Sequence, residues 1–126
     1  MIDKKIITLE LPHKSLSPNA RPNRFAKSNL TKQARTTASR ETYKCMNTWG
    51  LPSGTYYVVS LRFIAYWKTT RGKRDDVNLL ASCKAYEDGV QDAIGQDDST
   101  WSLEKPVHGF DPDNPRLEIE IEIEIL

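Results

Sequence analysis

The chain has 126 residues, enough for one domain with a single modest core. It contains no long apolar run and no signal-peptide pattern, so we expect a soluble protein that is not exported and has no membrane partner. The net charge of +1 conceals a division, because residues 1–74 carry fifteen Lys and Arg against three Asp and Glu, whereas residues 75–126 carry three against fourteen. This division indicates a polyanionic partner for the basic half, although two faces that attract each other would give the same composition.

The first quarter of the chain predicts a strand, a long loop and the start of a helix. Ile6–Leu11 alternates and ends before Pro12, as is typical of a strand. Ser15–Phe25 is rich in Pro, Asn and Ser, which predicts a loop. The basic residues in and just after it suit phosphate contacts, although solvated side chains would have the same sequence: Arg21, Arg24 and Lys27. Asn29 is a good N-cap for a basic helix from about Leu30 to Thr48.

The middle of the chain predicts a long strand, a basic loop and a second helix. Tyr56–Lys68 is rich in aromatic and β-branched residues and is the strongest strand signal. Thr69–Arg74 follows as a basic loop, and a helix is expected from Val77 to about Ile94, where Gly95 ends it. One stripe of that helix carries residues spaced three or four apart: Val77, Ala81, Lys84, Asp88 and Asp92.

The last quarter predicts two strands separated by a loop. Ser99–Leu103 is a short candidate strand, and Glu104–Pro115 contains three prolines and predicts a loop in which His108 stands alone. Arg116–Ile125 alternates perfectly, so it is a strand with one buried face and four glutamates on the other, for which we expect water in the absence of basic neighbours across the sheet. Residues 1–126 therefore form a single α+β domain, with a mainly antiparallel sheet of about four strands and two main helices packed on one side.

Acidic residues mark both ends of the second helix. Asp75 and Asp76 precede it, and Asp97 and Asp98 follow Gly95. If the fold brings these pairs together, they form an oxygen-rich site of the kind that holds Mg²⁺ or Mn²⁺. The alternative is structural: Asp76 caps the helix, Asp75 interacts with the helix dipole, and the second pair belongs to a polar turn. Cys45 and Cys83 form no motif, so we expect reduced packing residues and no zinc site.

With these residues placed, the chain resembles the RusA family of Holliday-junction resolvases, which is common in phages and prophages. The resemblance covers nearly the whole length, and its most specific motifs are Arg74-Asp75-x-x-Asn78-Leu79, Lys84-Ala85-x-x-Asp88-Gly89 and Gly95-x-Asp97-Asp98. It implies a homodimeric α+β endonuclease in the bacterial host cytoplasm that needs Mg²⁺ or Mn²⁺, uses no organic cofactor, and resolves four-way or branched DNA by paired nicks.

The resemblance also implies roles for individual residues. Asp75 and Asp98 match signature aspartates, Lys84 matches a lysine near the scissile phosphate, and Asp88 matches an acidic residue one turn later. The second signature aspartate falls on Val77, which cannot bind a metal, and the adjacent Asp76 is the candidate substitute. The implied catalytic set is therefore Asp75, Asp76, Asp98 and Lys84, and the implied metal ligands are Asp75, Asp76, Asp98 and Asp88. The implied DNA contacts are Arg71, Lys73, Arg74, Arg21, Arg24, Lys27 and Asn78.

Two other functions are compatible with the sequence. Val77 is consistent with a junction-binding protein of the same fold that has weakened or lost cleavage. The opposed charges of the two halves are consistent with a small protein-interaction domain. Metal-dependent nicking distinguishes the first of these from the nuclease, and salt-sensitive DNA binding distinguishes both from the interaction domain.

Overall fold

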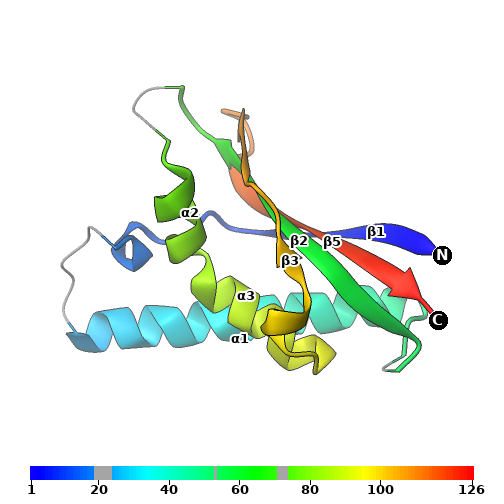
Figure 1. The fold of residues 1–126 in the computed structure, drawn as a ribbon. Coiled ribbons are helices and arrows are strands. Elements are labelled where there is room, and N and C mark those ends of the chain that lie inside the picture. The colour runs from blue at the N-terminus through cyan, green and yellow to red at the C-terminus, as the bar shows by residue number, and fades with distance from the viewer. Residues whose placement is uncertain (19–23, 53, 71–73) are drawn as a thin grey trace.

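Strand β5 (Arg116–Ile125) lies in the middle of a mixed sheet and pairs antiparallel with β1 (Ile2–Leu9) on one side and β2 (Tyr56–Trp67) on the other. Two short strands, β3 (Ser102–Leu103) and β4 (Val107–Phe110), run parallel to β2 along its other edge. The order is β1-β5-β2-β3, with β4 also paired to β2. The computed structural model describes residues 1–18, 24–52, 54–70 and 74–126, and Figure 1 shows their arrangement.

The alternation of β5 decides which face of the sheet is buried. Its Leu and Ile side chains from Leu117 to Ile123 are fully buried, because period-two alternation places them all on one face. Three of the four glutamates on the opposite face contact basic groups: Glu118 contacts Arg116, Glu120 contacts Lys4 and Arg62, and Glu124 contacts the terminal ammonium of Met1. Basic neighbours across the sheet therefore take the place of the expected water at Glu120, because Lys4 lies on β1 and Arg62 on β2.

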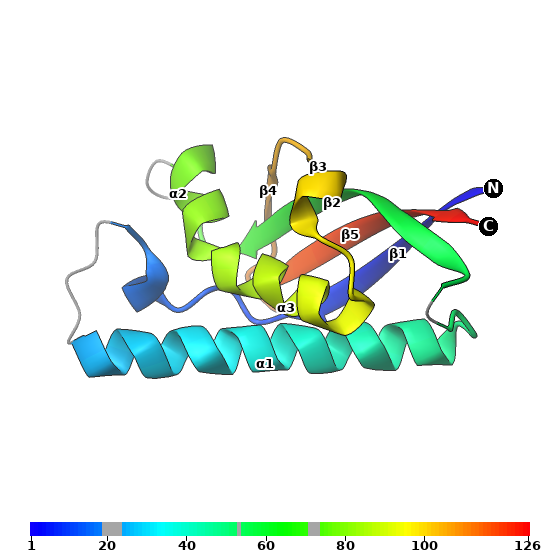
Figure 2. The same ribbon diagram turned by 60° about the horizontal axis from the view of Figure 1, so that its bottom comes forward.

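Helices cover the other face of the sheet. The 25-residue α1 (Arg24–Thr48) runs along the sheet, and α3 (Lys84–Ile94) lies beside it (Figure 2). Both helices contribute buried side chains to the core: Ala34, Ala38 and Met46 from α1, and Ala85, Tyr86 and Val90 from α3. The remaining core residues come from β1, β2 and β5, together with Leu79, Cys83 and Trp101. Within the described ranges, no helix is both long enough and apolar enough to cross a membrane.

Helices α1 and α3 approach each other closely at Gly89. An ideal Cβ placed there would lie 2.8 Å from the Cβ of Ala38 and 2.9 Å from the backbone nitrogen of Ser39. It would also collide with the carbonyl oxygen of Arg35. One turn further along α3, Asp92 accepts two hydrogen bonds from the Arg35 guanidinium at 2.6 and 2.8 Å. The close approach at Gly89 and the Arg35–Asp92 pair together hold α3 against α1. Helix α3 carries Lys84 and Asp88.

The α+β class is confirmed, and the details of the sheet and helices differ from the prediction. Over the residues that the structure describes, the sheet has five strands and is mixed, because the chain leaves β2 through two helices and returns parallel to it, as a crossover connection allows. The predicted helix from Val77 to Ile94 is interrupted at Cys83, where α2 (Asp76–Ser82) ends and α3 begins. Strand β4 lies inside the segment that was predicted to be a loop.

The remaining boundaries shift in the first half of the chain. Strand β1 begins at Ile2, because its pairing with β5 extends through the charged residues that obscured the alternation. Helix α1 begins at Arg24, so Asn29 lies inside the helix and is not its N-cap. A short 3₁₀ helix, η1 (Lys14–Leu16), occupies the start of the predicted loop.

Candidate functional site

Lys84 is the centre of an acidic cluster at the start of α3. Its Nζ lies 2.9 Å from Oδ2 of Asp98, 3.2 Å from Oδ1 of Asp88 and 3.5 Å from Oε1 of Glu87. The hydrogen bond to Asp98 is the largest of the interactions that raise the pKa of Lys84, so this side chain remains an ammonium ion at neutral pH. The Lys84 side chain is 57% exposed, and the cluster therefore lies at the surface of the protein.

The turn after α3 brings Asp98 back to Lys84. Helix α3 ends at Gly95, whose φ of 76° is a left-handed conformation that glycine adopts without strain. The amide side chain of Gln96 then accepts from the backbone N–H of Val58 at 2.8 Å and donates to the Val58 carbonyl at 2.9 Å. Asp97 caps the 3₁₀ helix η2 (Asp98–Thr100) through the N–H of Ser99. Because Gln96 attaches this turn to β2, the position of Asp98 is fixed relative to the sheet.

Glu87 belongs to the cluster but was not identified from the sequence. It is only 8% exposed, its Oε1 faces Lys84, and its Oε2 accepts a hydrogen bond from Nε1 of Trp101 at 3.1 Å. Its spacing of three residues from Lys84 is the sequence signal that could have indicated this contact. The buried Glu87 carboxylate accepts from both Lys84 and Trp101, so it holds the lysine ammonium from the interior of the protein.

A second cluster forms at the N-terminus of α2. His108 Nε2 lies 2.7 Å from Oδ1 of Asp76, and His108 Nδ1 accepts a hydrogen bond from Nε1 of Trp67 at 3.0 Å. The guanidinium of Arg74 lies 4.1 Å from the centre of a Trp67 ring. The prediction that His108 stands alone in a loop was wrong, because β4 pairs with the end of β2 and carries the imidazole to α2.

Asp75, and not Asp76, is the N-cap of α2. Its Oδ1 accepts from the backbone N–H groups of Val77 at 2.8 Å and Asn78 at 3.2 Å. Asp76 occupies the first helical turn, and the exposed fraction of Val77 is 73%. The carboxylates of Asp75 and Asp76 therefore have different roles in the local structure, one in the helix cap and the other in the contact with His108.

The four candidate metal ligands lie in two groups. Asp88 and Asp98 contact Lys84, whereas Asp75 and Asp76 lie at the other end of α2, a helix of seven residues that spans about 10 Å. Among the described residues, no three or more His, Cys, Asp and Glu side chains are gathered as ligands for a metal ion. The fold thus brings together the lysine and two of the predicted aspartates, but it does not join both acidic pairs into one group.

The predicted DNA contacts are distributed around the N-terminus of α2 and the start of α1. Arg74 and Asn78 line a cavity of about 240 Å³ together with Asp75, His13 and Lys14. Arg24 is the first residue of α1, and Lys27 is exposed one turn later. Arg21, Arg71 and Lys73 lie outside the described residues.

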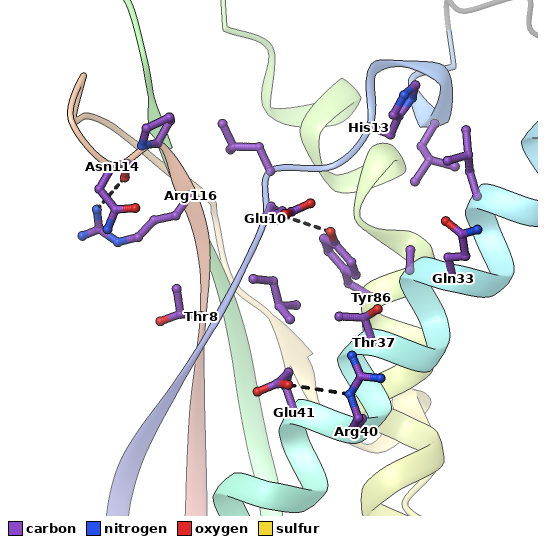
Figure 3. Close-up of a pocket in the computed structure, with 16 residues that line it drawn as sticks. Thr8, Glu10, His13, Gln33, Thr37, Arg40, Glu41, Tyr86, Asn114 and Arg116 are labelled. Carbon is purple, nitrogen blue, oxygen red and sulfur yellow. Dashed lines mark hydrogen bonds and ion pairs between the residues drawn. The ribbon is translucent and has the colours of Figure 1, made fainter.

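A cavity of about 700 Å³ lies between the end of β1, helix α1 and the residues that precede β5 (Figure 3). Burial raises the pKa of Tyr86 in this cavity to about 12, so its hydroxyl stays protonated and donates to the carbonyl of Glu10 at 2.9 Å. The cavity was not predicted from the sequence, and none of the candidate catalytic residues lines it.

No family model matches the chain. The chain is similar to an uncharacterized protein of Xylella fastidiosa (strain Temecula1 / ATCC 700964), with 41% identity over 95 residues. The matched region covers 73% of this chain and 59% of that relative, so the chain spans about three fifths of the length of the curated relative it matches.

Proposed function

We propose that the chain is a structure-specific, divalent-metal-dependent endonuclease that acts on four-way or branched DNA as a RusA-like homodimer. The observation that carries this proposal is the contact of Lys84 with Asp98 and Asp88 at the protein surface. These three residues come from two elements and are fourteen positions apart at most. A cation fixed by carboxylates at an exposed site is a suitable arrangement for stabilising charge on a phosphate.

The described side chains fit a metal site with one or two protein carboxylates, and they do not fit one with three or more protein ligands. A site with three or more protein ligands is absent from the described residues. Mg²⁺ commonly keeps several waters and takes only one or two carboxylates together with phosphate oxygens of the substrate. Asp75 and Asp76, adjacent at the N-terminus of α2, would hold a metal in this second way, and Asp98 and Asp88 are the further candidate ligands. When bound, the metal ion would polarise the scissile phosphodiester and lower the pKa of a water molecule.

The other roles follow from the chain's own residues. Lys84, held in its charged form by Asp98, donates to a phosphate oxygen and stabilises the charge that develops on it. Asp88 and Glu87 restrict the position of the ammonium group. Arg74, Asn78 and the basic residues of the first half of the chain bind backbone phosphates, which positions the DNA without reading its sequence. Two copies of the chain place two such sites on opposite strands of a junction.

The exposed Val77 favours a second candidate function. A carboxylate at this position would face solvent, where DNA approaches, and valine contributes no ligand there. Without a metal ligand at position 77, the chain would bind junctions but cleave them weakly or not at all. The two candidate functions share the DNA-binding surface and differ only in whether the protein cleaves the bound DNA efficiently.

Nicking of a synthetic four-way junction, with and without Mg²⁺ or Mn²⁺, tests the proposal. We expect Asp98→Asn to reduce nicking at least about 100-fold and to leave junction binding intact or tighter, since it removes a carboxylate that repels DNA. Asp113→Asn is the matched control, because it removes one negative charge from an exposed loop outside both clusters. Normal nicking by Asp98→Asn would refute the site assignment. Wild-type protein that binds the junction without nicking it would establish the second candidate.

A further inference from the structure

The hydrogen bonds around His108 define the protonation of its ring. The indole Nε1 of Trp67 carries a hydrogen and can only donate, so His108 Nδ1 must accept and carries no proton. A neutral imidazole then has its single N–H at Nε2, which faces Oδ1 of Asp76 at 2.7 Å. Trp67, His108 and Asp76 thus form a directed series in which each member donates to the next.

The sheet holds this series in place. Strand β4 pairs with β2 so that His108 lies opposite Ala65, two residues before Trp67. Gly109 is the next residue, and an ideal Cβ there would lie 2.9 Å from Cδ1 of Tyr66, so the Tyr66 ring packs over the glycine where a larger residue would have its side chain. The His108 and Trp67 rings are also nearly parallel, with an interplanar angle of 12°. The strand that carries the imidazole is therefore held in the sheet, and the ring contacts α2 from a fixed position.

Both ring nitrogens have partners, which excludes His108 as a group that takes a proton from an attacking water in this arrangement. What its Nε2–H does is fix one oxygen of the Asp76 carboxylate. Asp76 is otherwise a surface residue in the first turn of a short helix, and its side chain is 37% exposed. A carboxylate held through one oxygen keeps the lone pairs of the other for a ligand.

We propose that His108 is a positioning residue for Asp76, and that it orients this carboxylate as the divalent-metal ligand that substitutes for the one missing at Val77. This inference rests on the proposed nuclease function and deepens it. It assigns a role to a residue of β4, 32 positions from the aspartate on which it acts.

Two substitutions of His108 separate positioning from packing. Gln places its side-chain amide N–H near the position of Nε2, whereas Asn reaches only as far as Nδ1. We expect His108→Asn to weaken the binding of Mn²⁺, measured by calorimetry without DNA, about 10- to 100-fold. His108→Gln should retain an affinity near that of the wild type. Thermal unfolding of both variants checks that the difference does not come from loss of the fold.

A double-mutant cycle shows whether His108 acts through Asp76. If it does, Asp76→Asn and the double variant Asp76→Asn/His108→Asn should bind Mn²⁺ equally weakly, because the second change then has nothing left to remove. The ¹⁵N spectrum of the wild-type ring should show a protonated Nε2 and an unprotonated Nδ1.

The inference would be overturned, while the proposed function stands, by either of two results. One is a double variant whose loss of Mn²⁺ affinity equals the product of the two single losses. The other is a His108→Asn variant that binds Mn²⁺ like the wild type. Wild-type protein that neither binds Mn²⁺ nor nicks junctions would overturn both.

Discussion

The contact between α1 and α3 predicts that Gly89→Ala destabilises the protein. In an exposed helix this change would add about 0.5–1 kcal/mol of stability, because alanine has the better helix propensity. Here the new methyl group would lie 2.8 and 2.9 Å from atoms of Ala38 and Ser39 and would collide with the Arg35 carbonyl. Carbon atoms in good contact are about 3.5–4.0 Å apart, so the helices must separate by about 1 Å.

The expected magnitude follows from these opposed effects. Overpacking of a core costs about 1–3 kcal/mol, and the upper part of that range applies here because two of the three nearest atoms belong to the backbone and cannot rotate away. After subtraction of the propensity gain, we expect a loss of about 1–2 kcal/mol in the free energy of unfolding. For a chain of this size that loss lowers the melting temperature by about 4–8 °C.

Thermal and urea unfolding followed by circular dichroism provide the measurement. Gly95→Ala is the control at the end of the same helix, because an added Cβ there would meet no atom of another described segment within 4 Å and only the positive φ opposes it. Its expected cost is about 1 kcal/mol, and it should leave the Arg35–Asp92 contact intact. A Gly89→Ala variant as stable as the wild type, or more stable, would refute the close approach of the helices.

Two further predictions concern charge. Arg74→Ala should weaken junction binding, and the log–log dependence of affinity on salt should become shallower by about 0.9 for each phosphate that the protein no longer neutralises; an unchanged slope would place the DNA surface elsewhere. The Arg35 guanidinium lowers the pKa of Asp92, so this pair stabilises the fold above the unfolded pKa of about 3.9, and the contribution disappears as pH falls through the lower folded value. Asp92→Asn should therefore lose less stability than the wild type between about pH 5 and pH 2 in urea titrations. Its cost at neutral pH should stay below about 1 kcal/mol, because both side chains are about half exposed.

Elements with strong local periodicity could be predicted from the sequence. The alternation of Arg116–Ile125 and the aromatic, β-branched run of Tyr56–Lys68 correspond to β5 and β2, and the end of α3 at Gly95 was also predicted. Each of these signals depends on residues within a few positions of one another, because backbone conformation and one-sided burial are local requirements. The α+β class follows from the order of such elements.

The arrangement of the candidate site could be predicted only in part from such local sequence patterns. The spacing of four between Lys84 and Asp88 predicts that they share a helix face, and they do contact each other. No local pattern predicts that Asp98 returns to Lys84, because this depends on the attachment of Gln96 to Val58. The assignments of Arg21, Arg71 and Lys73 to DNA stay predictions.

The sequence by itself determined the main strands, the class of the fold and the separation of basic and acidic residues along the chain. Only the tertiary structure decided that Asp98 returns to Lys84, that Glu87 is buried beside Trp101, and that His108 meets Asp76. The physical reason is that β3 and β4 are too short to have a periodicity of their own and exist only because β2 offers them its free edge. Where the crossover through α2 and α3 returns to that edge determines which distant side chains meet.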